Sequence, residues 1–154
     1  GKRDSKGKTS YWRGYKLHLA TGDGDVPLAA ILTSASLHDS QVAIPLMQKV
    51  SERATVLYDL ADSAYDAEDI KNFSRKLGHV PIIDINKRRS DAIMLSPAEK
   101  RRYCERSGVE RTNSDLKDNY GVHHIRVKGH WKVLCHLMFS IIALTVKQLF
   151  NMLN

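Results

Sequence analysis

Residues 15–34 have the sequence YKLHLATGDGDVPLAAILTS, and they set the architecture of the first part of the chain. Side chains of different polarity alternate over Tyr15–Thr21, which predicts a β-strand. Gly22–Asp25 is a strong turn signal, because Gly and Asp tolerate the backbone angles of tight turns. Val26–Ser34 is then the returning strand, with Pro27 near its start, where a missing ladder donor is tolerated. This stretch therefore predicts an antiparallel hairpin.

Beyond the hairpin, helical and strand patterns alternate. Asp66 directly precedes a helical run and is predicted to cap it, and Gly78 suits the C-terminal cap of the same helix. Ser96, Pro97 and Glu99 form a near capping box at the start of another helix. The predicted elements are helices at Ser40–Val50, Asp66–Leu77, Pro97–Lys117 and Val133–Phe150, and strands at Ala54–Leu60 and Val80–Ile85. A hairpin followed by such alternation predicts an α/β fold with a mixed sheet flanked by helices on both faces.

Length and charge limit the class of protein. The chain has 154 residues, and its 24 Lys and Arg against 17 Asp and Glu give a net charge of +7. A basic excess favours a polyanionic partner, since cations that neutralise phosphates release condensed counterions. The two cysteines, Cys104 and Cys135, are too few and too far apart for a zinc site, and they fit a reducing cytosol. We expect one domain over residues 1–154, either bound to nucleic acid or merely basic.

The stretch Val133–Phe150 resembles a membrane span in length, but it contains polar residues including Lys147. A spanning helix needs about 20 mostly apolar residues. The apolar positions of the stretch follow the spacing of one helical face. We therefore expect a buried amphipathic helix and no membrane, with Trp131 and Phe139 in the core.

Asp62 is a first candidate for chemistry because it follows the apolar strand Ala54–Leu60. In open α/β sheets, ligands bind outside the carboxyl ends of the strands. A carboxylate there suits a hard cation such as Mg²⁺, which prefers oxygen ligands. The alternative is that Asp62 caps a turn or a helix, and position alone leaves both interpretations open.

A second candidate is a stripe on the helix that begins near Pro97. Tyr103, Arg106, Glu110 and Lys117 lie within an arc of about 60° on a regular helix. Glu110 could ligate a metal, while Arg106 and Lys117 could face phosphates. The alternative is a solvated face on which Arg106 and Glu110 form an i,i+4 pair.

Four segments of the chain resemble, in the same order, the motifs of one family. Tyr103–Lys117 matches without a gap the Y-R-E-K signature of the DDE transposases of bacterial insertion sequences. Asp62–Asp66 resembles the segment that holds the second carboxylate of that family. Gly14–His18 resembles its strand after the first carboxylate, and Leu37–Ser40 resembles its short hDs segment.

This resemblance implies an RNase H-like fold and a DNA transposase that performs strand cleavage and strand transfer. Asp62 and Glu110 would be two catalytic and metal-binding carboxylates for Mg²⁺ or Mn²⁺. In the family, one metal activates the nucleophile and the other stabilises the leaving oxygen. Tyr103, Arg106 and Lys117 would contact DNA. The implied partners are the terminal inverted repeats of the element, a target DNA and a second copy in a synaptic complex, in the cytoplasm at the nucleoid.

The chain also departs from the family pattern. The first catalytic Asp of the family precedes the segment that Gly14–His18 resembles, and Asp4 is the sole acid before Gly14. We expect the first strand and its Asp to be missing. Gly108 stands where the family often has an aromatic residue, which predicts weaker helix packing near Glu110. Two alternatives are an inactive remnant that only binds DNA through its basic surface, and a nuclease of the same fold.

Overall fold

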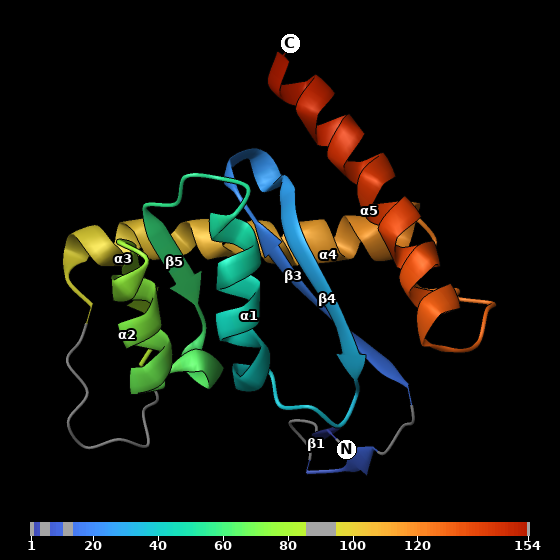
Figure 1. The fold of residues 1–154 in the computed structure, drawn as a ribbon, viewed down its shortest axis with the longest axis horizontal. Coiled ribbons are helices and arrows are strands. Elements are labelled where there is room, and N and C mark those ends of the chain that lie inside the picture. The colour runs from blue at the N-terminus through green and yellow to red at the C-terminus, as the bar shows by residue number, and fades with distance from the viewer. Residues whose placement is uncertain (1, 4–6, 11–13, 86–94, 154) are drawn as a thin grey trace.

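The computed structural model describes residues 2–3, 7–10, 14–85 and 95–153, so Asp4 lies outside the described residues. Figure 1 shows α1 and α2 in front of the strands and α4 passing behind them. The elements are β1 (Lys2–Arg3), β2 (Thr9–Ser10), β3 (Tyr15–Thr21), η1 (Asp23–Asp25), β4 (Pro27–Ser34), α1 (Ser40–Ser51), β5 (Tyr58–Ala61), η2 (Ser63–Tyr65), α2 (Glu68–Lys76), β6 (Val80–Ile83), α3 (Pro97–Tyr103), η3 (Cys104–Arg106), α4 (Ser107–Asn119) and α5 (His130–Leu153). The predicted α/β class is confirmed.

The predicted hairpin is confirmed almost residue for residue. Strands β3 and β4 pair antiparallel, with Leu17 opposite Leu32 and His18 opposite Ile31. Leu17 and Leu32 belong to the hydrophobic cluster beneath α5. His18 points to the opposite face, where it is buried and its Nε2 lies 2.9 Å from the hydroxyl of Thr33. Because side chains alternate along β3, the strand contributes Leu17 to the cluster beneath α5 and His18 to the opposite face.

Strands β5 and β6 form a parallel pair that α2 connects. Gly78 has φ of +83° just after α2, as its predicted capping role requires. The prediction for Asp66 is wrong: Ala67 is the N-cap residue of α2 and makes no side-chain cap bond. Asp66 instead forms an ion pair with Lys71, one turn into the helix. Asp66 thus lies one position before the N-cap residue of the helix.

The sheet differs from the predicted one. In the described parts of the chain, β1–β2, β3–β4 and β5–β6 are three separate two-stranded sheets. Helices link the two larger pairs, since α1 packs against β3, β4 and α2, while α4 packs against β3 and η3 lies against β5. The chain thus has antiparallel and parallel pairing, as predicted, but in separate ladders.

The capping box of Ser96 and Glu99 is confirmed at the start of α3. The predicted single helix is divided by η3, after which α4 continues. Gly108 of α4 does not weaken the packing as expected, because a Cβ atom there would lie 2.6 Å from Oδ1 of Asp25. Arg111 donates two hydrogen bonds of 2.7 Å to the same carboxylate. Glycine therefore lets the turn of the hairpin dock on the helix that holds Glu110.

The C-terminal helix is only partly buried, which corrects the prediction. One side of α5 packs against the hairpin and α4, and its buried residues are Val133, Leu137, Ser140, Ile141 and Leu144. Trp131 and Phe139, expected in the core, are 76% and 74% exposed. By length and composition alone, α5 is a helix that could cross a membrane, although a core helix can meet the same test.

Candidate functional site

Asp62 lies directly after β5, at the carboxyl end of the parallel pair, as the sequence predicts. Its side chain accepts a hydrogen bond of 3.0 Å from the backbone N–H of Ala64 and thereby caps η2. This capping contact matches the alternative interpretation of Asp62. The hydrogen bond from Ala64 goes to Oδ1 of Asp62, and Oδ2 takes no part in it.

The charge of Asp62 reaches residues from two other elements. Burial, followed by the charges of Asp39 and Asp62, raises the pKa of Tyr65 to about 12. Burial also raises the pKa of Tyr103, against a lowering effect of Arg106, and the Asp62 charge adds to the rise. The negative charge of Asp62 thus disfavours ionisation of both phenols.

The first three residues of the predicted helical stripe contact one another. The guanidinium of Arg106 lies 5.5 Å from the ring centre of Tyr103 and forms an i,i+4 ion pair of 2.8 Å with Glu110. Burial lowers the pKa of Arg106, but the opposing effects of Tyr103, Glu110 and Asp62 prevail and raise it. Arg106 therefore neutralises Glu110 in this conformation, and the charge of Asp62 adds to the rise of its pKa.

Glu110 and Lys117 face a common groove of about 980 Å³. Strand β3, the connection before α5 and the first turns of α5 form its other walls, with Leu17, Leu32 and Leu137 on the apolar part. The charged residues that line it are Lys16, Glu110, Lys117 and Lys128. Three lysines around one carboxylate make this a surface suited to phosphate oxygens.

The two segments before Asp62 that resemble the family motifs also meet in space. Lys16 donates a 2.7 Å hydrogen bond to the carboxylate of Asp39 and a 3.0 Å bond to the carbonyl of Leu37. Asp39 in turn acts on the pKa of Tyr65, which Asp62 also affects. Hydrogen bonds thus join the first two segments, and the charges of Asp39 and Asp62 both act on Tyr65 of the third segment.

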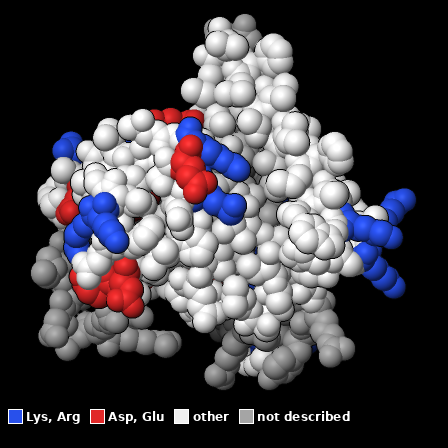
Figure 2. All heavy atoms as spheres, in the orientation of Figure 1, with Lys and Arg blue, Asp and Glu red and all other residues white. Residues whose placement is uncertain are grey.

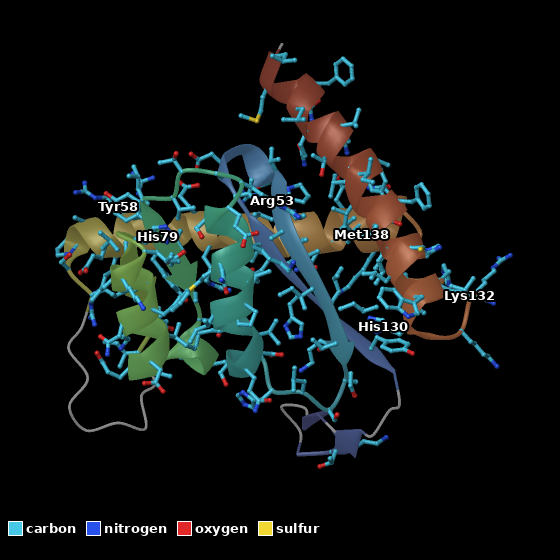
Figure 3. All side chains as sticks on the ribbon, in the orientation of Figure 1. Arg53, Tyr58, His79, His130, Lys132 and Met138 are labelled. Carbon is cyan, nitrogen blue, oxygen red and sulfur yellow. The ribbon has the colours of Figure 1, made fainter. Side chains whose placement is uncertain are left out.

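Sequence reasoning missed a buried polar network next to this site. Asp59 Oδ2 accepts a 2.6 Å hydrogen bond from the hydroxyl of Ser74 and lies 2.9 Å from Nδ1 of His79. Figure 3 labels His79 beside β5. The network ties β5 to α2 and so fixes the strand that precedes Asp62. The only available signal was a carboxylate inside an apolar strand, which must find partners when buried.

Asp84 is a second residue that the sequence analysis passed over. It directly follows β6, and its backbone N–H bonds to the carbonyl of Ala61, the residue before Asp62. Its charge also raises the pKa of Tyr103. Its position after a buried strand, like that of Asp62, was the signal that could have identified it.

Asp62 and Glu110 offer carboxylate oxygens, which Mg²⁺ and Mn²⁺ prefer as ligands. Within the described ranges, no group of three or more His, Cys, Asp or Glu side chains gathers closely enough to hold a metal ion. The donor chemistry of each carboxylate therefore fits a divalent cation, while the described residues show no assembled set of ligands.

Comparison with known proteins identifies the family. The chain belongs to the family described as Transposase DDE domain, which it matches over residues 1–146. It is also similar to the proteins named "Probable transposase for insertion sequence element ISH11" from two strains of Halobacterium salinarum. With each it shares 26% identity over 140 residues, covering 78% of this chain and 42% of the relative. The chain thus spans less than half the length of these relatives. No solved structure matches it significantly.

Proposed function

We propose that the chain is the catalytic part of a DNA transposase that cleaves and joins DNA strands by metal-dependent, in-line phosphoryl transfer. The observation that supports this best is that residues of the segments with family-like motifs pair with one another, Lys16 with Asp39 and Arg106 with Glu110, and that Asp62 follows a strand of the parallel pair. These residues come from four segments far apart in the sequence. The DNA partners in the proposal are the terminal inverted repeats of an element and a target DNA.

Asp62 and Glu110 are the proposed metal-binding carboxylates. When bound, Mg²⁺ or Mn²⁺ supplies charge stabilisation at the scissile phosphate. Arg106 has two roles in the proposal. It neutralises Glu110 while the site is free, and its permanently charged, planar guanidinium turns to phosphate oxygens when DNA binds. The side-chain fractions exposed, 27% for Arg106 and 61% for Glu110, leave both groups accessible for this exchange.

The groove provides the proposed path for the DNA backbone. Lys117 and Lys128 are exposed along it and bind phosphates, which positions the DNA without reading its sequence. In the proposal, Tyr103 also contacts DNA. It lies beside Arg106, at the Asp62 end of the stripe formed by Tyr103, Arg106, Glu110 and Lys117. In the proposal, the hairpin and the parallel strand pair belong to one RNase H-like fold.

A second candidate function has its own support. The Arg106–Glu110 pair and the partial set of carboxylates are also what a protein that only binds DNA would have. Such a remnant would keep the lysine-lined groove and lose the cleavage chemistry. Binding of DNA alone therefore does not separate the two candidates, and metal binding and strand cleavage must be measured together.

The first test measures Mn²⁺ binding from the electron paramagnetic resonance signal of the free ion. The chain is compared with Asp62→Asn and Glu110→Gln, and with Glu105→Gln as a matched control on the exposed face of η3. We expect both site variants to weaken Mn²⁺ binding by at least tenfold and the control to leave it unchanged. Equal binding by all four proteins would refute the proposed metal ligands.

The second test measures nicking of supercoiled plasmid by the same four proteins with Mg²⁺ or Mn²⁺. Nicking that both site variants abolish and the control retains is the result expected of the transposase. Salt-sensitive DNA binding without Mn²⁺ binding or nicking would favour the DNA-binding remnant instead. In either case, Lys117→Ala should reduce the dependence of log Kd on log salt by about 1, because one phosphate contact is lost.

A further inference from the structure

Positive charge gathers where α5 begins. Residues 119–154 contain no Asp or Glu, and their Lys and Arg are Arg126, Lys128, Lys132 and Lys147. The first three of these lie close together in the sequence and are exposed. We call Arg126, Lys128 and Lys132 the basic cluster. Figure 2 shows basic atoms projecting from the side of the molecule where α5 begins, with no acidic atoms beside them on the visible face.

The basic cluster has no acidic partner in the parts of the chain that the structure describes. Other cations of the fold are matched by carboxylates, as Arg111 is by Asp25 and Lys147 is by Asp115. No ion pair within the described ranges involves a member of the cluster. Cations of this kind favour an anionic ligand, and a chain of phosphates gains most, because each neutralised phosphate releases condensed counterions.

A row of aromatic rings lies among these cations. The ring centre of His130 is 5.6 Å from that of Tyr15 and 5.5 Å from that of Trp131, with edge-on geometry in both pairs. Trp131 is 76% exposed, although tryptophan is highly buried on average. Figure 3 labels His130 and Lys132 at this end of α5. The basic cluster therefore surrounds an aromatic surface that the rest of the described chain leaves open.

This surface continues the groove that contains Glu110 and Lys117. Tyr15, at one end of the aromatic row, also lines the groove, and so does Lys128 of the basic cluster. A ligand that follows the groove past Lys117 therefore reaches Trp131 without leaving the positively charged surface. We call the basic cluster, together with Tyr15, His130 and Trp131, the α5 entry patch.

We infer that the α5 entry patch binds unpaired DNA, with phosphates on the basic cluster and a base stacked on Trp131. In a duplex the faces of the bases are covered by their neighbours, so an exposed indole ring gains little from it. An unpaired base offers a free face, and stacking on aromatic side chains is how single strands are held without sequence preference. The choice of DNA as the polyanion rests on the proposed function, whereas the single-stranded form follows from the aromatic row.

The test measures binding of the full chain to labelled oligo(dT) of about 15 nucleotides and to a duplex of the same length, by fluorescence anisotropy in EDTA. Trp131→Ala should raise Kd for oligo(dT) by about tenfold or more and leave Kd for the duplex unchanged, because only the single strand loses a stacking contact. Lys132→Ala should weaken binding of both forms, since both have phosphates. It should also reduce the dependence of log Kd on log salt for oligo(dT) by about 0.7.

The chain offers a matched control for Trp131. Phe139 is also an exposed aromatic residue of α5, about two turns further along the helix, and Phe139→Ala should leave both Kd values unchanged. Trp131→Phe keeps a ring and should retain most of the binding. The chain has two tryptophans, so in a Trp12→Phe background the emission of Trp131 alone is followed, and oligo(dT) should quench it. Circular dichroism checks that all variants keep their helix content.

Absence of oligo(dT) binding would overturn the inference, and so would equal effects of Trp131→Ala on the two forms of DNA. Flotation with phosphatidylcholine–phosphatidylglycerol vesicles that depends on Trp131, without oligo(dT) binding, would assign the patch to lipid instead. The double variant Asp62→Asn with Glu110→Gln should bind oligo(dT) at least as tightly as the unchanged chain. If plasmid nicking fails while binding that depends on Trp131 is found, the catalytic proposal falls and this inference stands.

Discussion

Replacing Gly108 by Ala tests how firmly the hairpin turn is fixed on α4. In an ordinary helix this change gains up to about 1 kcal/mol of stability, because glycine has the higher entropy when unfolded. In this chain the new methyl group would lie 2.6 Å from Oδ1 of Asp25. Asp25 cannot rotate away without stretching both of its hydrogen bonds to Arg111. The two effects therefore have opposite signs.

The structure indicates that the steric effect is larger. Overpacking of a tight contact costs about 1–3 kcal/mol, and we expect the upper part of that range because the backbone of Asp25 is also held. Its carbonyl accepts a 3.0 Å hydrogen bond from the hydroxyl of Thr112. After subtraction of the helix gain, Gly108→Ala should lower the free energy of unfolding by about 1–2 kcal/mol.

The assay is urea unfolding of the four proteins of a double-mutant cycle between Gly108→Ala and Asp25→Ala. Without the Asp25 carboxylate, the same Gly108→Ala change should become stabilising by about 0.5–1 kcal/mol. The predicted coupling between the two positions is thus about 2 kcal/mol, well above the error of such cycles. If Gly108→Ala were stabilising to the same extent in both backgrounds, the reasoning about this contact would be wrong.

Two further predictions concern burial and pH. In urea unfolding, Leu144→Ala should lower the free energy of unfolding by about 2–5 kcal/mol, because it leaves a cavity. Leu149 lies on the exposed face of α5, so Leu149→Ala should lower it by well under 1 kcal/mol in the monomeric chain. Burial lowers the pKa of His18, against a raising effect of Asp39, so the unfolded chain binds this proton more readily. Stability should therefore decrease as the pH falls below about 6.5, and His18→Gln should make this decrease smaller. An identical pH profile for the His18 variant would contradict the assignment.

The sequence alone was sufficient wherever local chemistry determines the structure. The alternation of Tyr15–Thr21 and the turn residues after it predicted the hairpin, and Ser96 with Glu99 predicted the start of α3, because these signals act over a few neighbouring residues. It also placed Asp62 after a strand and predicted, as one alternative, the i,i+4 ion pair of Arg106 with Glu110, although η3 divides the helix expected to carry both. Family membership followed from short motifs that need no three-dimensional information.

Other features depended on contacts between distant residues, which no local pattern specifies. Asp66 was expected to cap α2, but the N-cap residue lies one position later and Asp66 forms an ion pair with Lys71. Gly108 looked like a weakness in α4 until the turn at Asp25 was found against it. Apolar composition predicted that α5 would be buried, yet burial depends on how much of the fold is available to cover a helix, and here one face stays exposed. The local sequence thus determined the elements and the residue types at the site. Tertiary packing decided which charges meet and which apolar face stays exposed, because both depend on residues far apart in the chain.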